Sequence, residues 1–293
     1  MDPIALILLI LCPLAWSAFD FLRKRLAALG RATPVTLLLA LVQLPVVAAW
    51  AVVDTAADAA RLPAAGYWLP ALGSLAVAVL GTLAFQRSVE VSELSAVVPL
   101  LSLTPVFASG LGIWLLGEVP SGRQWLGVTL VVLGVLVMGV GDRWRLRSLV
   151  QGLRREPGSG PMILAALLFA TAPLFDKRAL SCASMSVHAT FVIAGVVLAL
   201  GLWLLATHRL GELRVLLRRP RLLAAGAAVS LLAFALQLAA IQRLWVGLLE
   251  TVKRATGATM ALLLGALLLG ETLRPPRIAA VALMVVGVAW VMT

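Results

Sequence analysis

Residues 112–118 read GIWLLGE and residues 265–271 read GALLLGE, which is nearly the same segment 153 positions later. The same step carries Lys24-Arg25 onto Lys177-Arg178. A constant step between separate segments indicates that the chain is a duplicated unit, as in many membrane carriers. We therefore expect two related halves rather than one irregular domain.

Composition places the chain in a membrane. Hydrophobic residues make up 62% and charged residues 13%, and the mean hydropathy is +1.04, which excludes an ordinary soluble domain. The net charge of +11 is carried by arginines clustered in short segments between apolar stretches, so we expect no nucleic-acid partner. Cys12 and Cys182 match no metal or redox spacing, and no metal or cofactor is predicted.

Ten apolar runs of membrane-crossing length lie along the chain. A crossing needs about 20 mostly apolar residues, and the runs cover roughly 3–22, 34–53, 66–85, 95–117, 124–141, 161–178, 187–207, 221–241, 247–270 and 276–292. The predicted fold is all-α and integral to the membrane, with ten transmembrane helices. The first run has no basic start and no cleavage site after it, so we expect it to be a retained span. The predicted domains are then 1–141, a basic linker 142–160, and 161–293.

The basic residues predict the orientation. Loops on one side, including the linker, carry 17 lysines and arginines, whereas the opposite loops carry 5. The richer side should face the cytoplasm, which places both termini on the periplasmic or extracellular side of a bacterial inner membrane. Five spans in each half mean that the second half enters from the other side. The two five-helix repeats are therefore predicted to be inverted, which is the architecture of alternating-access carriers.

The arrangement resembles the drug/metabolite transporter superfamily, in particular bacterial EamA-type carriers. The matching features are the two halves, the Leu-Gly-Glu that closes the fourth and ninth spans, and the Gly-rich segments 127–135 and 280–288 that follow. The resemblance implies a transporter rather than an enzyme, with a central cavity between the halves and with the fifth and tenth helices at the periphery. The sequence gives little support for an enzyme, because the only histidines are His188 and His208 and there is no His-Glu-x-x-His metal motif.

A narrower likeness concerns Thr251-Val252-Lys253-Arg254, which resembles the Val-Lys-Arg segment of plastid phosphate translocators. Those carriers also use a lysine in the fourth helix. Here the fourth span, 95–117, has no cation, and the repeat partners of the pair are Leu100-Leu101. A third phosphate ligand would have to come from Lys24 or Lys177.

Lys253-Arg254 is the strongest candidate site. Gly270 lies 16 positions beyond Arg254, or about 24 Å along a helix, so the pair cannot reach the far membrane face. Unpaired charge at such depth costs ~2.5–3.5 kcal/mol per residue. An ammonium and a guanidinium together suit a dianionic oxyanion. The alternative is a self-neutralised turn in which Glu250 pairs with both cations.

The other two lysines have competing interpretations. Lys24 sits at a predicted cytoplasmic helix end, where basic residues commonly anchor helices. Lys177 lies on the predicted outer side, where the charge rule asks for no cation. The repeat step favours both as ligands that contribute as the cavity alternates, although a duplicated anchor would show the same symmetry.

Embedded carboxylates are the candidates for coupling to protons. They are Asp20, Asp176 and Glu250. Asp20 stands four residues before Lys24, so a plain intrahelical pair competes with the coupling role. Glu118 and Glu271 end their helices next to loops and are predicted to be interfacial or structural.

Polar residues within the spans could line the cavity. Those in apolar surroundings are Trp16, Gln86, Gln237, Thr256, Ser102, Thr104 and Thr259, with simple packing as the alternative for Trp16. Pro99 and Pro105 should interrupt the fourth helix and Gly257 should loosen the ninth, and broken helices often mark transporter sites.

The fifth span has Gly127, Gly134 and Gly141 at steps of seven, which allows close helix approach. Packing within the monomer is the favoured interpretation, and a homodimer through the fifth or tenth helix is the alternative.

The sequence thus predicts a secondary transporter for a small anion bearing phosphate or carboxylate, either free or lipid-linked. Lys253 and Arg254 would hold it while Glu250 orients them. The alternatives are a proton-coupled exporter of amino acids or cationic amphiphiles, and a lipid scramblase or non-transporting scaffold. Membrane lipids are the expected surroundings in each case.

Overall fold

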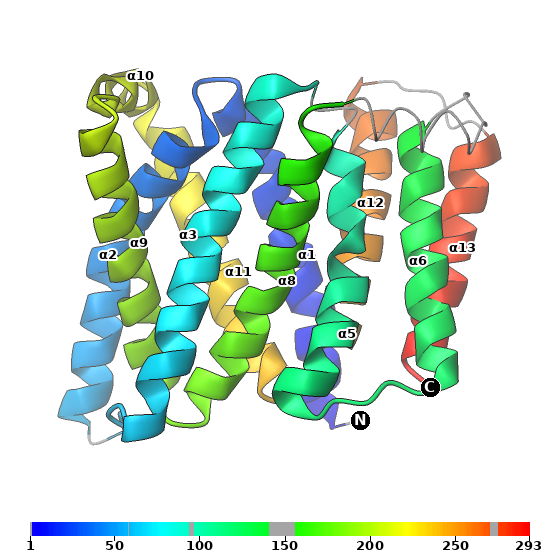
Figure 1. The fold of residues 1–293 in the computed structure, drawn as a ribbon, viewed down its shortest axis with the longest axis horizontal. Coiled ribbons are helices and arrows are strands. Elements are labelled where there is room, and N and C mark those ends of the chain that lie inside the picture. Colours follow the sequence, from blue (N-terminus) through cyan, green and yellow to red (C-terminus); the bar gives the residue numbers. More distant parts are fainter. Residues whose placement is uncertain (1, 58, 94–96, 141–155, 270–274) are drawn as a thin grey trace.

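The computed structural model describes the whole chain except residues 1, 58, 94–96, 141–155 and 270–274 (Figure 1). The described residues form helices and no strand. The first half contains α1 (Pro3–Ala27), α2 (Ala32–Ala56), η1 (Ala65–Tyr67), α3 (Trp68–Val91), η2 (Val98–Leu103), α5 (Thr104–Leu116) and α6 (Gly122–Val140). The second contains α8 (Ser159–Leu180), α9 (Met185–Ala206), η3 (Leu210–Glu212), α10 (Leu213–Leu217), α11 (Pro220–Ile241), α12 (Val246–Leu269) and α13 (Pro275–Val291).

Nine of the ten predicted spans are each occupied by one long helix, and the fourth is occupied by η2 followed by α5, with ends that differ by a few residues. The helix of the second half begins two residues before the predicted start at 161, because α8 already includes Ser159. The start of α8 is held on α3: Ser88 Oγ donates to the Gly158 carbonyl at 2.7 Å, and the Gly158 N–H donates to Ser92 Oγ at 3.0 Å. The greater part of the predicted linker lies outside the described residues.

The fourth span is broken as predicted. Val98–Leu103 is a 3-10 helix that passes directly into α5, with Pro99 and Pro105 near the two starts, because proline removes the backbone N–H that a continuous α-helix would need. The corresponding prediction for Gly257 was wrong, since α12 runs unbroken through this residue. Helical hydrogen bonds on both sides outweigh the cost of a single glycine, which is only about 1 kcal/mol.

The outer surface of the bundle is apolar. Seven described helices are long and apolar enough to cross a membrane: α1, α2, α3 with η1, η2 with α5, α8, α9 and α11. Gly122–Met138 and Pro275–Val291 are shorter apolar helices. Large apolar side chains point outward, with Trp114 86% and Leu69 83% exposed. Hydrocarbon rather than water suits such a surface.

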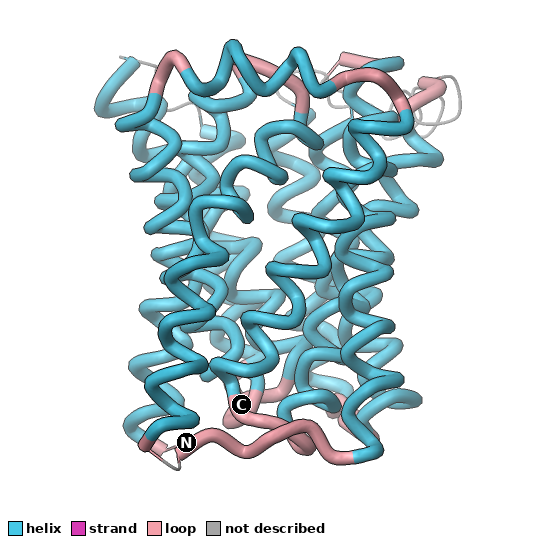
Figure 2. Tube along the Cα trace, turned by 90° about the vertical axis from the view of Figure 1, so that its left-hand side faces the viewer, coloured by secondary structure: helices cyan, strands magenta, loops and turns pink. Residues whose placement is uncertain are grey.

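The helices run side by side between two ends of the bundle (Figures 1 and 2). Both chain termini lie at one end, which we call the termini end, and α1 finishes and α8 begins at the opposite end. Exchanging the two halves of the chain preserves the contacts between helices. Thus α3 packs on α8 while α11 packs on α1, α5 packs on α8 while α12 packs on α1, and α2 with α9 and α6 with α13 each form a pair.

Glycine allows the close approach of α6 and α13. A Cβ on Gly127 would lie 2.5 Å from the carbonyl oxygen of Gly287, and one on Gly134 would lie 2.9 Å from that of Ala280. Both glycine faces are therefore filled within the chain, and Gly141 lies outside the described residues. A homodimer through the fifth or tenth helix stays a prediction that would have to use other faces of these helices.

Candidate functional site

Lys253 is the centre of a polar cluster inside the bundle. Its Nζ donates to Glu250 Oε1 at 2.7 Å and to Gln237 Oε1 at 2.6 Å. It also lies 4.8 Å from the ring centroid of Trp16 on α1, in a cation–π contact. The side chains of Lys253 and Glu250 are only 15% and 3% exposed. Three helices, α1, α11 and α12, thus bring together Trp16, Gln237, Glu250 and Lys253, all of which are predicted site residues.

Arg254 points to a different neighbour. Its Nη2 donates to Thr104 Oγ1, at the start of α5, over 3.1 Å, and the side chain is half-buried. The charged groups close enough to act on its charge are Glu250, Asp20 and Arg23. The change from η2 to α5 therefore positions a partner for Arg254, because Thr104 is the first residue of α5. A guanidinium has five N–H donors, and this hydroxyl takes one of them.

The start of α12 is buried rather than exposed at the membrane surface. Leu244 and Val246 are both buried, and two charged side chains bind their backbone groups. Lys177 Nζ donates to the Leu244 carbonyl at 2.8 Å, and the Val246 N–H donates to Glu118 Oε2 at 3.0 Å. Lys177 Nζ and Glu118 Oε1 are themselves 2.6 Å apart. We call these four groups the termini-end clamp.

The clamp gives Glu118 and Lys177 structural roles in this conformation. It joins the end of α5, the end of α8 and the beginning of α12. The negative charge of the Glu118 carboxylate interacts favourably with the positive end of the α12 dipole. Glu118 was predicted to be interfacial or structural, and these contacts favour the structural interpretation. A ligand role for Lys177 stays a prediction for a conformation in which the clamp has opened. Glu271, the counterpart of Glu118 in the second repeat, lies outside the described residues.

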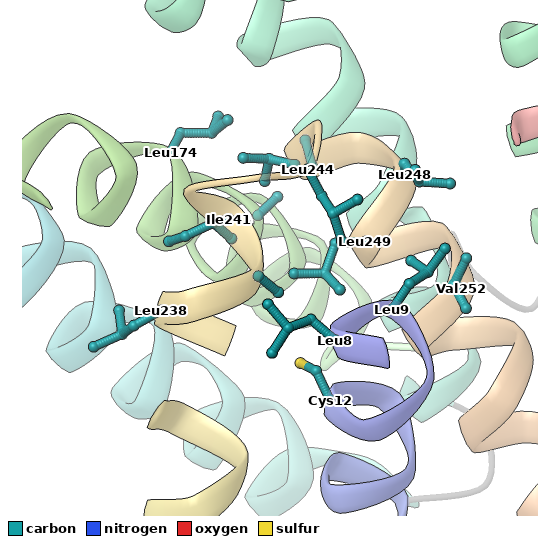
Figure 3. Packing of buried hydrophobic residues seen from close by; sticks show 14 of the residues in the cluster. Leu8, Leu9, Cys12, Leu174, Leu238, Ile241, Leu244, Leu248, Leu249 and Val252 are labelled. Atoms are coloured by element: carbon teal, nitrogen blue, oxygen red, sulfur yellow. The ribbon is translucent and has the colours of Figure 1, made fainter. Parts of the chain in front are cut away.

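Buried apolar side chains from α1, α11 and α12 pack together in a layer (Figure 3). Its side chains, which belong to one buried cluster, are Leu8, Leu9, Cys12, Leu238, Ile241, Leu244, Leu248, Leu249 and Val252. In α12 the members of this layer precede Lys253, and α12 begins at the termini end. Because α1 also begins at that end and its Leu8, Leu9 and Cys12 precede Trp16, the buried apolar layer lies between the termini end and the polar cluster.

The opposite end of α1 is polar and exposed. Asp20 Oδ1 accepts from Arg23 Nη2 at 2.8 Å, and both side chains are nearly half exposed. Asp20 thus pairs within its helix, as one interpretation of the sequence predicted, but its partner is Arg23 and not Lys24. Lys24 is exposed at the end of α1, in a position that suits an interfacial anchor. Its role as a ligand remains a prediction.

Asp176 belongs to a second buried network, near the termini end and apart from Lys253. Its Oδ1 accepts from Ser74 Oγ and lies 3.0 Å from His188 Nε2, and His188 Nδ1 lies 3.2 Å from the hydroxyl of Tyr67. All four residues are at most 2% exposed. Sequence reasoning missed His188 and Tyr67. The only signal in the sequence was that each stands as an isolated polar residue in an apolar stretch. Their contact could not be predicted, because it forms only when α3 packs on α8 and α9.

The remaining predicted residues divide between the site and helix capping. Gln86 lies outside the Lys253 cluster: its Oε1 accepts from the backbone N–H of Thr33 at 2.6 Å, and its Nε2 donates to Glu90 at 3.0 Å. It therefore satisfies the start of α2, one of the groups that a helix leaves unpaired. Thr256 is half-buried on α12, two residues beyond Arg254. Its role as a ligand stays a prediction.

Two buried polar atoms near the cluster lack a partner among the described residues. They are the indole Nε1 of Trp16 and the hydroxyl of Ser102, two residues before Thr104. Buried donors are nearly always satisfied in native proteins. The Trp16 N–H belongs to the same ring that Lys253 covers, so the cluster has an unused donor beside its cations. Within the described residues, no group of three or more His, Cys, Asp or Glu side chains could hold a metal ion.

Comparison with known families gives the chain its class. The sequence model of the EamA-like transporter family matches twice, over residues 3–140 and 158–293. The chain belongs to the EamA-like transporter family. It is therefore a multi-pass membrane protein and a transporter of the drug/metabolite type. The two matches fall on the two halves that the repeat step predicted.

One solved structure shares the fold of this EamA-like transporter. It is titled only "Crystal structure of protein", with a TM-score of 0.75 and 17% sequence identity over 99% of this chain and 96% of that one. At this identity the likeness concerns the fold alone. Among curated proteins, none matches the EamA-like chain.

Proposed function

We propose that this protein is a secondary carrier that moves a small organic anion, bearing phosphate or carboxylate, across a bacterial inner membrane by alternating access. The two halves would act as inverted five-helix repeats around the Lys253 cluster. The helix contacts that survive exchange of the halves support this arrangement, as does the position of both termini at one end. Inverted repeats can exchange conformations because each half can adopt the other's packing.

The observation that carries the proposal is the state of Arg254. Its guanidinium is half-buried in a membrane bundle, and its hydrogen bond to Thr104 is one to a neutral hydroxyl. A buried cation in a membrane protein is energetically costly, so those that are retained usually line a pathway for a substrate or ion. A carboxylate or phosphate can take two oxygens across the fork of a guanidinium, which gives both charge and geometry. The unsatisfied N–H of Trp16 supplies one more donor for an anion.

Access to the site would come from the end opposite the termini. The apolar layer and the termini-end clamp close one side, whereas Asp20 and Arg23 are exposed on the other. The distribution of basic residues supports a cytoplasmic position for that open side and a periplasmic position for both termini. Lys177 would contribute once the termini-end clamp has opened, whereas Lys24, exposed at the end of α1, would anchor that helix at the membrane surface. Exchange of one anion for another would spare the cations from crossing the cycle without a counter-charge.

The rival, a proton-coupled exporter of amino acids or cationic amphiphiles, requires a free carboxylate. In the described conformation each candidate already has a partner. Glu250 binds Lys253, Asp20 binds Arg23 and Asp176 binds His188. This occupancy favours an anion over a cation as the cargo. A scramblase or scaffold would make no use of Arg254.

The test is the melting temperature of the detergent-purified protein with phosphorylated metabolites, lipid phosphates, amino acids and organic cations. A ligand at about 100 times its dissociation constant should add about 2.7 kcal/mol to the native state. We expect anions to stabilise the wild type, and Arg254→Gln to abolish that effect. Arg87→Gln, a matched change at an exposed arginine on α3, should leave it intact. Stabilisation by cations alone would favour the exporter, and no ligand response from any class would favour the scaffold.

A further inference from the structure

We propose that Glu250 sets the charge of the cargo, so that the site accepts an anion with a single negative charge and rejects a dianion. This inference rests on the anion carrier proposed above and names its substrate class. The cargo would be a monocarboxylate or a phosphodiester, free or part of a lipid. It departs from the dianion that the paired lysine and arginine indicate on sequence alone.

The charges around the site add up to one positive charge. Lys253 and Arg254 contribute two cations, and Glu250 contributes one anion at 2.7 Å from Lys253 Nζ. The other charged groups that act on Arg254 are Asp20 and Arg23, which neutralise one another at 2.8 Å. Glu250 is 3% exposed, so solvent screens its charge little. The site therefore has one positive charge left for a ligand.

Glu250 also determines which cation receives the ligand. The ammonium of Lys253 already has Glu250, Gln237 and the face of Trp16 as partners, so its three donors are largely used. The guanidinium of Arg254 donates to one hydroxyl. A ligand group with two oxygens that share one charge matches that fork. Both a carboxylate and a phosphodiester meet this description.

A dianion would leave the site with one uncompensated negative charge. At partly buried positions a charge without a partner is costly, because water no longer solvates it and no second cation is free. A phosphate monoester would also bring a second negative charge toward the Glu250 carboxylate. The carboxylate thus acts as a built-in first anion, and only the second position is left for the cargo.

The experiment compares two probes with the same aromatic ring, phenyl phosphate and methyl phenyl phosphate. At pH 8 the first is mainly a dianion, because the second phosphate ionisation lies near pH 6, and the second is a monoanion. We expect the wild type to bind the diester at least ~10-fold more tightly, which corresponds to about 1.4 kcal/mol. In Glu250→Gln the order should reverse, because the amide keeps an acceptor for Lys253 but removes the charge.

A double variant supplies the control. Lys253→Met with Glu250→Gln has the same net charge as the wild type, so it should again prefer the diester. If Glu250→Gln alone does not fold, Lys253→Met serves instead: it leaves no net positive charge, and both probes should lose affinity by ~10-fold or more, in line with one lost charge interaction. A short-chain phosphodiester lipid in the same assay distinguishes a lipid cargo from a free phosphodiester. A carrier of lipids should bind it more tightly than methyl phenyl phosphate.

The outcomes distinguish the two proposals. If neither probe nor any other anion binds the wild type, the anion carrier itself is wrong. If both probes bind with a preference that Glu250→Gln does not change, the carrier stands and the role of Glu250 as charge selector is overturned. Wild-type preference for phenyl phosphate would overturn it as well.

Discussion

Opening of the termini end can be measured with a cysteine that the chain already has. Cys12 is fully buried in the apolar layer, between the Lys253 cluster and the termini end. A thiol-reactive maleimide can reach it from that end only when the layer parts. Glu118→Gln should make this happen more often, because it removes the charge that holds Lys177 and weakens the bond to the N–H of Val246.

The size of the effect follows from the contacts of the clamp. The side chains of Lys177 and Glu118 are 24% and 15% exposed, so the pair lies between a surface ion pair, about 0.2–1 kcal/mol, and a desolvated charged hydrogen bond, about 1.5–3 kcal/mol. Glutamine retains part of the hydrogen bonding. A net loss of about 1.4 kcal/mol is a fair central value, which raises the population of the open state roughly tenfold.

The assay measures the rate at which a membrane-impermeant maleimide labels Cys12 in a Cys182→Ser background, in reconstituted vesicles. We expect Glu118→Gln to label roughly ten times faster than its parent. Arg178→Gln is the matched control, because Arg178 lies at the same end of α8 but is exposed, and its side chain donates to the Leu115 carbonyl and not to Glu118 or α12. Equal rates in parent and Glu118→Gln, or the same acceleration in Arg178→Gln, would refute the clamp as the element that closes this end.

Three further predictions concern stability and the lysines. Gly127→Ala should lower the melting temperature, because overpacking costs about 1–3 kcal/mol. Gly201→Ala, with open space around it, should be neutral or stabilising by up to about 1 kcal/mol, and a similar loss in both variants would contradict the close packing of α6 on α13. Asp176→Ala should destabilise by about 2–5 kcal/mol, since it strands two buried donors, and an unchanged melting curve would mean that the network is not held together. Lys24→Gln should leave anion binding within about twofold because an exposed anchor touches no ligand, and a loss as large as that of Arg254→Gln would make Lys24 a ligand.

Hydropathy and repetition predicted the class and the helices correctly. Each of the ten spans could be located because burial in hydrocarbon requires about 20 apolar residues in sequence, which is a local property of the chain. The break at Pro99 and Pro105 was equally local, since proline lacks the N–H that a helix needs. The same local reasoning failed at Gly257, where the context of a long helix outweighs a modest intrinsic preference.

The partners of the polar residues could not be found in this way. Asp20 pairs with Arg23 although Lys24 has the better-known helical spacing, and both choices are compatible with a helix. Gln86 was expected near the cargo but caps α2. A rotation of a helix by one residue decides such outcomes, and only the packing of neighbouring helices fixes that rotation.

The sequence by itself determined that this protein is a duplicated helical membrane carrier with two cations, Lys253 and Arg254, held inside it, because charge in an apolar run is visible without any structure. The tertiary structure decided what those cations do. Thr104 reaches Arg254 from 150 positions away, and Trp16 covers Lys253 from the first helix. Such contacts depend on how helices distant in the chain pack together, so no single segment of the sequence specifies them.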